Sequence, residues 1–87
     1  MFAAYSSVDL IKDLPFSVRE NIPTMMYTEH HYKKNSDSSV VINGKKLRAG
    51  AVVASSIRIE KILRDGILLK EKQYQFKMRA LNSWLNY

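Results

Sequence analysis

Few side chains in this 87-residue chain combine the type and the spacing that metal binding requires. His30 and His31 are the only histidines, and adjacent residues of a strand point to opposite faces, so the two rings cannot bind one metal ion together. The chain has no Cys, and the neighbouring carboxylates of Glu29 and Asp37 are in no ligand spacing. The pattern predicts no metal and no cofactor, with one His partly buried and the other exposed.

Nucleophilic catalysis is not indicated either. None of the serines in predicted loops lies in a glycine-flanked elbow or has a general base nearby in the sequence. These serines are Ser36, Ser38, Ser39, Ser55 and Ser56. The acidic residues are isolated, and a substrate pocket would consume much of the thin core of so short a chain. The sequence therefore predicts a protein that is not an enzyme.

Basic and aromatic residues leave one further chemical option open. The formal net charge is +6, divided as −1 through Asn43 and +7 from Gly44 onward. Aromatic residues are set among Lys and Arg, as in barrels that stack the bases of nucleic acids; they are Tyr27, Tyr32, Tyr74 and Phe76. A basic small barrel that binds nucleic acid or another polyanion is therefore an alternative. We favour a core stripe of Tyr74, Phe76 and Met78, with the basic residues on the solvent face of a sheet.

Short apolar strands joined by tight turns account for most of the chain. Asn43-Gly44 follows β-branched residues and suits a two-residue type I′ hairpin turn. Asp65-Gly66 is a second tight turn, and we expect both glycines to hold positive φ. The predicted strands are Met25–Tyr32, Val40–Ile42, Lys46–Arg48, Ser56–Leu63 with a bulge near Lys61, Ile67–Lys70 and Tyr74–Met78. This pattern predicts an all-β domain, a small antiparallel sandwich or partly open barrel of about five to seven short strands.

Helical segments are expected mainly before the strands. Residues 1–7 are predicted to be a loose leader, and residues 8–22 form the helical segment of a single domain, 8–79. Pro15 ends a first amphipathic turn and begins a second short helix, Phe16–Asn21. The residues expected to face the sheet are Phe16, Val18 and Ile22. The tail, residues 80–87, is predicted to be a frayed helical turn carrying Trp84. No apolar run approaches the ~20 residues that span a bilayer.

The order of these motifs is more specific than any one of them. The segment LPFSVRENIP precedes a strand with His-x-Tyr and a polar loop, and the hairpin SVVINGKKLRAG follows. An Asp-Gly turn and a strand with aromatic-x-Phe come next. The residues in this order are Leu14, Pro15, Val18, Arg19, Pro23, His30, Tyr32, Val40, Ile42, Asn43, Gly44, Arg48, Gly50, Asp65, Gly66, Tyr74 and Phe76. The set resembles the C-terminal periplasmic domain of the type II secretion system protein B family, also called general secretion pathway protein B. Ala51 and Ser38-Ser39 depart from the family pattern, at positions expected to face solvent.

The resemblance implies a non-catalytic scaffolding role. Members of the family work beside the outer-membrane secretin channel, contact its periplasmic domains, and cooperate with the ATPase partner protein A where one exists. The implied task is to help the secretin assemble or stay in place across the cell wall, with peptidoglycan as a further implied partner. The resemblance also implies a periplasmic location, an inner-membrane anchor upstream of this fragment, and no nucleic-acid partner.

A partner strand can add to an open sheet edge, where it gains main-chain hydrogen bonds. The first predicted strand follows a helix and precedes the longest polar loop, Lys33–Ser38, so hairpin geometry constrains its register least. Strict alternation would place Tyr27, Glu29 and His31 on one face, with Tyr27 as an anchor of large contact area. The predicted partner-binding residues are Tyr27, Glu29, His31 and Tyr32. The alternative is that this strand is paired internally and that Tyr27 belongs to the core.

Overall fold

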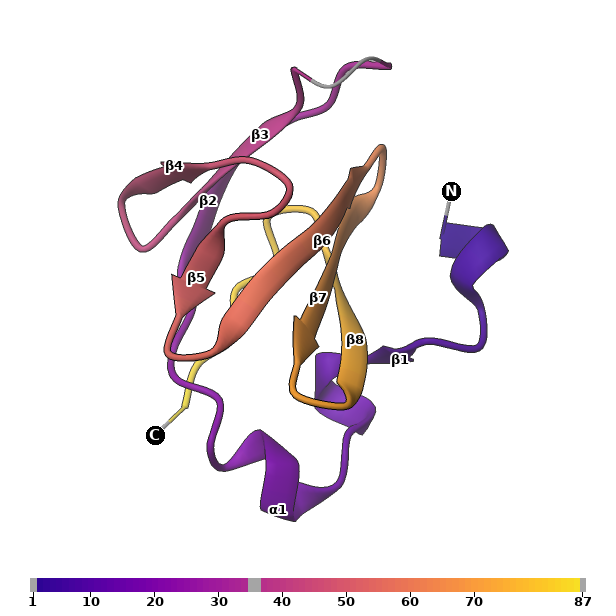
Figure 1. Ribbon diagram of the computed structural model, residues 1–87, viewed down its shortest axis with the longest axis vertical. Coiled ribbons are helices and arrows are strands. Elements are labelled where there is room, and N and C mark those ends of the chain that lie inside the picture. The colour runs from indigo at the N-terminus through magenta and orange to yellow at the C-terminus, as the bar shows by residue number, and fades with distance from the viewer. Residues whose placement is uncertain (1, 35–36, 87) are drawn as a thin grey trace.

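Eight strands in two sheets form the framework of the part of the chain that the structure describes, residues 2–34 and 37–86 (Figure 1). The structure is a computed structural model. Its strands are β1 (Asp9–Leu10), β2 (Tyr27–His31), β3 (Ser39–Ile42), β4 (Lys45–Leu47), β5 (Val52–Ala54), β6 (Ile57–Leu63), β7 (Gly66–Glu71) and β8 (Tyr74–Arg79). The α-helix labelled in Figure 1 is α1 (Phe16–Arg19). The predicted all-β fold is confirmed.

The larger sheet has five strands in the order β1-β8-β7-β6-β5. Its strands pair antiparallel except at one edge, where β1 runs parallel to β8. In β6 the register shifts between Ile59 and Lys61, which confirms the predicted bulge. The extra residue changes the phase of the side chains, so Ile57 and Ile59 belong to the main core whereas Leu63 belongs to a second cluster.

The smaller sheet has three strands in the order β2-β3-β4. Asn43 and Gly44 connect β3 to β4 with φ angles of 53° and 79°, as the predicted type I′ turn requires. Val40, Ile42 and Leu47 of this hairpin are buried and pack with residues of the larger sheet. The main core is therefore shared by the two sheets.

A second cluster covers the other face of the larger sheet. It consists of Phe2, Leu63 and Leu68, with partly buried residues of the N-terminal segment packed against it. Three consecutive apolar side chains of β7 are buried for this reason: Leu68 faces the second cluster, whereas Ile67 and Leu69 face the main core. A strand with apolar contacts on both faces needs no polar alternation.

The N-terminal segment differs from the predicted loose leader. Phe2–Tyr5 form a 3₁₀ helix, and the Phe2 side chain is buried. The backbone N–H of Phe2 donates to the Asp65 carboxylate at 3.0 Å, and the Lys77 ammonium donates to the Tyr5 carbonyl oxygen at 3.0 Å. These contacts hold the segment on the larger sheet. Lys77 is buried, so detaching the segment would cost the free energy of leaving its ammonium without an acceptor.

Only the second of the two predicted helices forms. The residues of the first contain β1 and a 3₁₀ helix, Ile11–Asp13, and Pro15 follows as the N-cap of α1. Val18 and Ile22 are buried as predicted, whereas Phe16 is 69% exposed and the prediction that it faces the sheet is wrong. A helix of four residues turns only one side to the core, and Val18 occupies that side.

The tail also differs from prediction. Where the structure describes it, residues 80–86 form no helix but fold back beside the start of β2, where Trp84 forms an antiparallel bridge with Met25. The Trp84 indole N–H donates to the Ile22 carbonyl oxygen at 3.2 Å, and the Asn86 amide donates to the same oxygen at 2.7 Å. The tail is therefore attached by main-chain and side-chain hydrogen bonds together.

Gly66 is needed for a reason other than the predicted one. Positive φ is found at Gly44 and Gly50 but not at Gly66. A Cβ on Gly66 would instead lie 2.1 Å from the Met78 carbonyl oxygen and 2.3 Å from Cζ of Phe2. The absence of a side chain thus permits β7, β8 and the N-terminal segment to approach closely.

Candidate functional site

Strand β2 lies at an edge of the smaller sheet, as the docking prediction requires. Its start is covered by the tail: Met25 and Trp84 exchange two backbone hydrogen bonds of 2.8 and 3.0 Å, and the Tyr27 N–H donates to Ser83 Oγ at 2.8 Å. Glu29 to His31 pair only with β3 among the described strands, and Thr28 lies at the register shift without a partner in β3. The open part of this edge is therefore the second half of β2.

The faces of β2 are not those that strict alternation predicts. The register with β3 shifts between Tyr27 and Glu29, which adds one residue to this strand. Tyr27 and His30 consequently point inward together, whereas Glu29 and His31 lie on the exposed side. The prediction that Tyr27 shares a face with Glu29 and His31 is wrong.

Tyr27 is a core residue, 2% exposed, and not a surface anchor. Its hydroxyl lies 2.5 Å from Nδ1 of His30, and Nε2 of His30 lies 2.9 Å from the Leu63 carbonyl oxygen and 3.2 Å from that of Arg64. A carbonyl oxygen can only accept, so Nε2 carries the proton and Nδ1 accepts from the Tyr27 hydroxyl. Burial raises the pKa of that hydroxyl. This chain of hydrogen bonds joins β2 to the end of β6 and leaves Tyr27 unavailable to a partner.

The other predicted binding residues reach the surface. Glu29 Oε1 lies 2.9 Å from Nε2 of His31, and both side chains are 57% exposed. Tyr32 is partly exposed, with the Arg64 guanidinium 5.9 Å from its ring centroid. The prediction of one partly buried and one exposed histidine is confirmed by His30 and His31.

The serines considered for catalysis have structural roles where the structure describes them. Ser38 Oγ accepts from the Lys33 N–H and donates to its carbonyl oxygen, and Ser56 donates to the Glu71 carboxylate. Ser39 is buried in β3, Ser55 has a φ of 50°, and Ser36 lies outside the described residues. In residues 2–34 and 37–86 no three His, Cys, Asp or Glu side chains gather in a group that could hold a metal ion. No helix in those ranges is long and apolar enough to cross a membrane.

The aromatic residues considered for base stacking are divided between the core and the surface. Phe76 and Tyr27 are buried, whereas Tyr74 is 36% exposed and Tyr32 partly exposed. Phe76 and Met78 are core residues as predicted, whereas Tyr74 is exposed, so the prediction that it belongs to the core stripe is wrong. The buried members offer no ring face to a nucleic acid.

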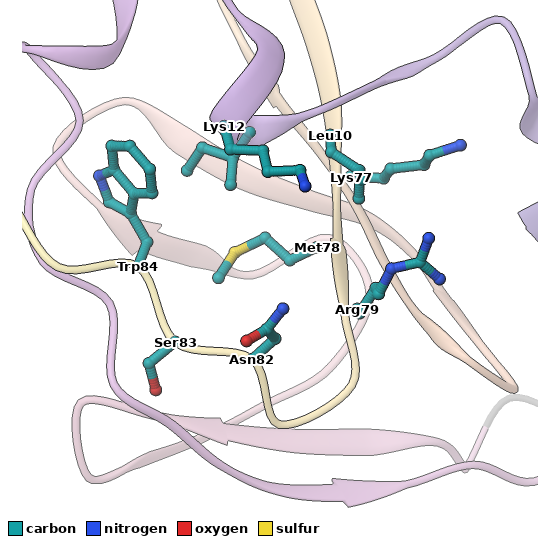
Figure 2. A pocket seen from close by; sticks show the side chains of 9 residues that line it. Leu10, Lys12, Lys77, Met78, Arg79, Asn82, Ser83 and Trp84 are labelled. Atoms are coloured by element: carbon teal, nitrogen blue, oxygen red, sulfur yellow. The ribbon is translucent and has the colours of Figure 1, made fainter.

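The sequence did not predict a cavity of about 250 Å³ that lies between the tail and the end of β8 (Figure 2). It is lined by the residues labelled in Figure 2 together with Ile11, which come from residues 10–12, the end of β8 and residues 82–84. Each segment alone reads as part of a different element. No pattern in the sequence indicates that these three segments lie together. The tail was predicted to form a separate helical turn, so the cavity was not expected.

Comparison with known proteins agrees with this architecture. Residues 22–80 match the family described as type II secretion system protein B. General secretion pathway protein B of Aeromonas hydrophila is 28% identical over 75 residues, which cover 85% of this chain and 33% of the relative. This chain thus spans about a third of the length of that curated relative.

A solved structure has a similar fold. The crystal structure of Dickeya dadantii GspB, from the type 2 secretion system, matches with a TM-score of 0.70 and 25% sequence identity. The match covers 72% of this chain and 76% of that chain. The family match contains every strand from β2 to β8. The chain belongs to the type II secretion system protein B family.

Proposed function

We propose that this chain is a non-catalytic periplasmic scaffolding domain that binds the outer-membrane secretin of the type II secretion system through the edge of β2. The family match supports a role in type II secretion. The secretin as partner is what the resemblance of the sequence implies. The observation that supports the docking site is the position of β2 at an open sheet edge, with Glu29 and His31 exposed on it.

Strand length favours β2 over the other edges. In the described residues β1 has two residues, β4 and β5 have three each, and β2 has five. Each main-chain hydrogen bond to a partner strand contributes a net ~0.5–1.5 kcal/mol, so a longer edge offers more binding energy. Even with the start of β2 covered by the tail, Thr28 to His31 exceed the length of either three-residue edge strand.

Side chains beside the open half of β2 would set the register of the partner strand. Glu29 and His31 contact each other at the surface, and polar groups of a partner can replace that contact by binding either side chain. Tyr32 takes the anchoring role first expected of Tyr27, because its ring is partly exposed at the end of the strand. The protein A ATPase and peptidoglycan are further partners that the resemblance implies, and we assign neither of them to a surface of this chain.

Titration against the isolated periplasmic region of a cognate secretin tests the proposal. We expect saturable binding in the micromolar range, which suits a small edge contact. Tyr32→Ala should weaken this binding by about tenfold because it removes the anchor. Tyr74→Ala is the matched control, since it truncates an exposed aromatic residue at another end of the molecule. A flat titration at high protein concentration contradicts the proposed function.

Cysteine labelling tests the edge itself, because the natural chain has no Cys. Thr28→Cys places a single thiol on β2, and a bulky maleimide attached there should block secretin binding. Lys45→Cys on β4, the opposite edge of the same sheet, should bind equally well with and without the label. The unlabelled variants report whether the fold tolerates each substitution. Equal loss at both edges, or no loss at Thr28, would place the contact elsewhere.

A further inference from the structure

The cavity beside β8 has no part in docking along β2. We propose that it binds an acidic segment of a partner protein, taking up one apolar side chain of that segment while Lys12 and Asn82 bind an adjacent carboxylate. The cavity is bounded by residues 10–12, the end of β8 and residues 82–84 (Figure 2). This proposal does not depend on secretin binding at the β2 edge.

The charge of the lining favours an anionic occupant. Lys12, Lys77 and Arg79 line the cavity, and no Asp or Glu does. Four other surface cavities in the described residues each include an acid in their lining: Glu60, Glu20, Asp37 and Glu71 respectively. Asp9 and Asp13 are close to Lys12 in the chain, but neither lines the cavity. This cavity is thus the one of the five that presents only positive charge.

Two of the three cations are already engaged. The Lys77 ammonium donates to the Tyr5 carbonyl oxygen, and the Arg79 guanidinium lies 5.7 Å from the ring centroid of Phe2. Figure 2 shows both side chains directed away from Trp84. Lys12 is exposed, and its ammonium forms no hydrogen bond or ion pair with the described residues. It is the cation of this lining that is free to bind a carboxylate.

Asn82 supplies a second donor. Its backbone N–H donates to the Arg79 carbonyl oxygen at 3.1 Å, and its exposed side-chain amide forms no hydrogen bond with the described residues. An amide N–H and an ammonium can share one carboxylate, since each carboxylate oxygen accepts more than one hydrogen bond. The polar part of the cavity therefore suits a carboxylate better than a cation.

The apolar part of the cavity limits the size of the occupant. Leu10, Ile11, Met78 and Trp84 contribute apolar surface, and the Trp84 N–H already donates to Ile22, so the indole offers its ring. A volume of about 250 Å³ is below the ~300–1,000 Å³ of pockets that enclose whole small molecules. One Leu or Phe side chain of a peptide fits that size, and the rest of the peptide would lie along the open rim.

The test is an NMR titration of the ¹⁵N-labelled chain with three synthetic peptides. The peptide Asp-Asp-Leu-Phe-Gly carries both features, Lys-Lys-Leu-Phe-Gly reverses the charge, and Asp-Asp-Ser-Ser-Gly removes the apolar side chains. With both ends blocked, only the first should bind, in the high micromolar to millimolar range. Its shifts should be concentrated at residues 10–12, 77–79 and 82–84, including the Trp84 indole N–H. Equal binding of all three peptides, or shifts spread over the basic surface, overturns the proposal.

Two variants assign the polar contacts. Lys12→Glu should weaken binding of the first peptide by about five- to tenfold, because an exposed ion pair is replaced by repulsion. Lys70→Glu is the matched control: it makes the same charge change on an exposed residue of β7 outside this cavity, and should change the affinity less than twofold. Asn82→Asp keeps the side-chain shape and adds a carboxylate to the lining, so it should also weaken binding. If Lys70→Glu weakens binding as much as Lys12→Glu does, the attraction comes from net charge and the site is refuted.

Discussion

His30 joins the two sheets through its ring, because Nε2 contacts the Leu63 carbonyl oxygen of β6 while Nδ1 contacts the Tyr27 hydroxyl of β2. His30→Ala removes both partners and leaves the buried Tyr27 hydroxyl without its acceptor. We expect a loss of about 2–3 kcal/mol in the free energy of unfolding, measured by urea denaturation. His31→Ala is the adjacent control and should change it by less than about 0.5 kcal/mol, because that ring is exposed. Equal losses for the two variants would contradict the connecting role of His30.

The buried Tyr27 hydroxyl makes the free energy of unfolding depend on pH in the alkaline range. Burial raises the pKa of Tyr27 above its ordinary value of 10.0, so the folded chain keeps a proton that the unfolded chain releases above about pH 10. The free energy of unfolding is therefore unaffected by this group below pH 10 and falls as the pH rises beyond it. The loss is at most about 1.4 kcal/mol per pH unit for one proton.

Unfolding free energies between pH 8 and 11 test this dependence. Tyr27→Phe should give a shallower decline above pH 10 than the natural chain, because it removes the group that titrates only after unfolding. Tyr74→Phe is the control, since it removes a hydroxyl from a tyrosine that is not buried. Any slope common to all three proteins does not come from Tyr27. Identical slopes for the natural chain and Tyr27→Phe would contradict the assignment.

The tail acts as an additional strand for the start of β2, and its contribution can be measured separately. Trp84→Ala removes the indole that packs against the main core and donates to Ile22. We expect a loss of about 2–3 kcal/mol in the free energy of unfolding, below the range for a fully buried Trp because this one is partly exposed. Hydrogen exchange should quicken at the Met25 and Tyr27 amides, which bond to the tail, before those of β7. Leu85→Ala, at a neighbouring side chain that is 46% exposed, should be nearly neutral. An unchanged exchange rate of the Met25 amide in Trp84→Ala would mean that the indole is not needed to hold the tail beside β2.

The strands that could be predicted are those whose pairing is local. The β3–β4 hairpin follows from Asn43-Gly44, and the bulge in β6 follows from the position of Ile62, which is out of phase with Ile57 and Ile59. β5 has three residues, too few for an alternation to be visible. β1 has two residues and exists only because β8 pairs with it from far along the chain. Distant pairing leaves no periodicity in the sequence, so neither β1 nor the tail could be predicted.

The position of β2 at a sheet edge was predictable, and the side chains that it exposes were predictable only in part. The position of β2 followed from its neighbours in the chain, since no tight turn fixes it to the strand before. The bulge between Tyr27 and Glu29 has no marker in the sequence, because neither Gly nor Pro is involved, and it reversed the expected direction of Tyr27. A one-residue shift moves every following side chain to the other face.

Across the whole molecule, the tail connects the two proposed binding features. Trp84 and Ser83 hold the start of β2 by hydrogen bonds and also line the cavity beside β8. An occupant of the cavity would rest on the same residues that cover the first part of the docking edge. The two proposed sites use different side chains. The β2 edge uses Glu29, His31 and Tyr32, whereas the cavity uses Lys12 and Asn82. Both sites adjoin the tail.

The parallel pairing of β1 with β8 also sets the order in which the chain can fold during its synthesis. Asp9 lies opposite Phe76 and Leu10 opposite Lys77, so β1 has no strand to pair with until residues 76 and 77 have left the ribosome. The Phe2 side chain waits almost as long, because Leu63 and Leu68 complete its cluster. Contacts between distant parts of a chain form slowly, since closing a long loop costs entropy before any contact repays it. Among the described residues, the segment from Phe2 to Leu10 is therefore the one that waits longest for its partners, exposed to chaperones and proteases.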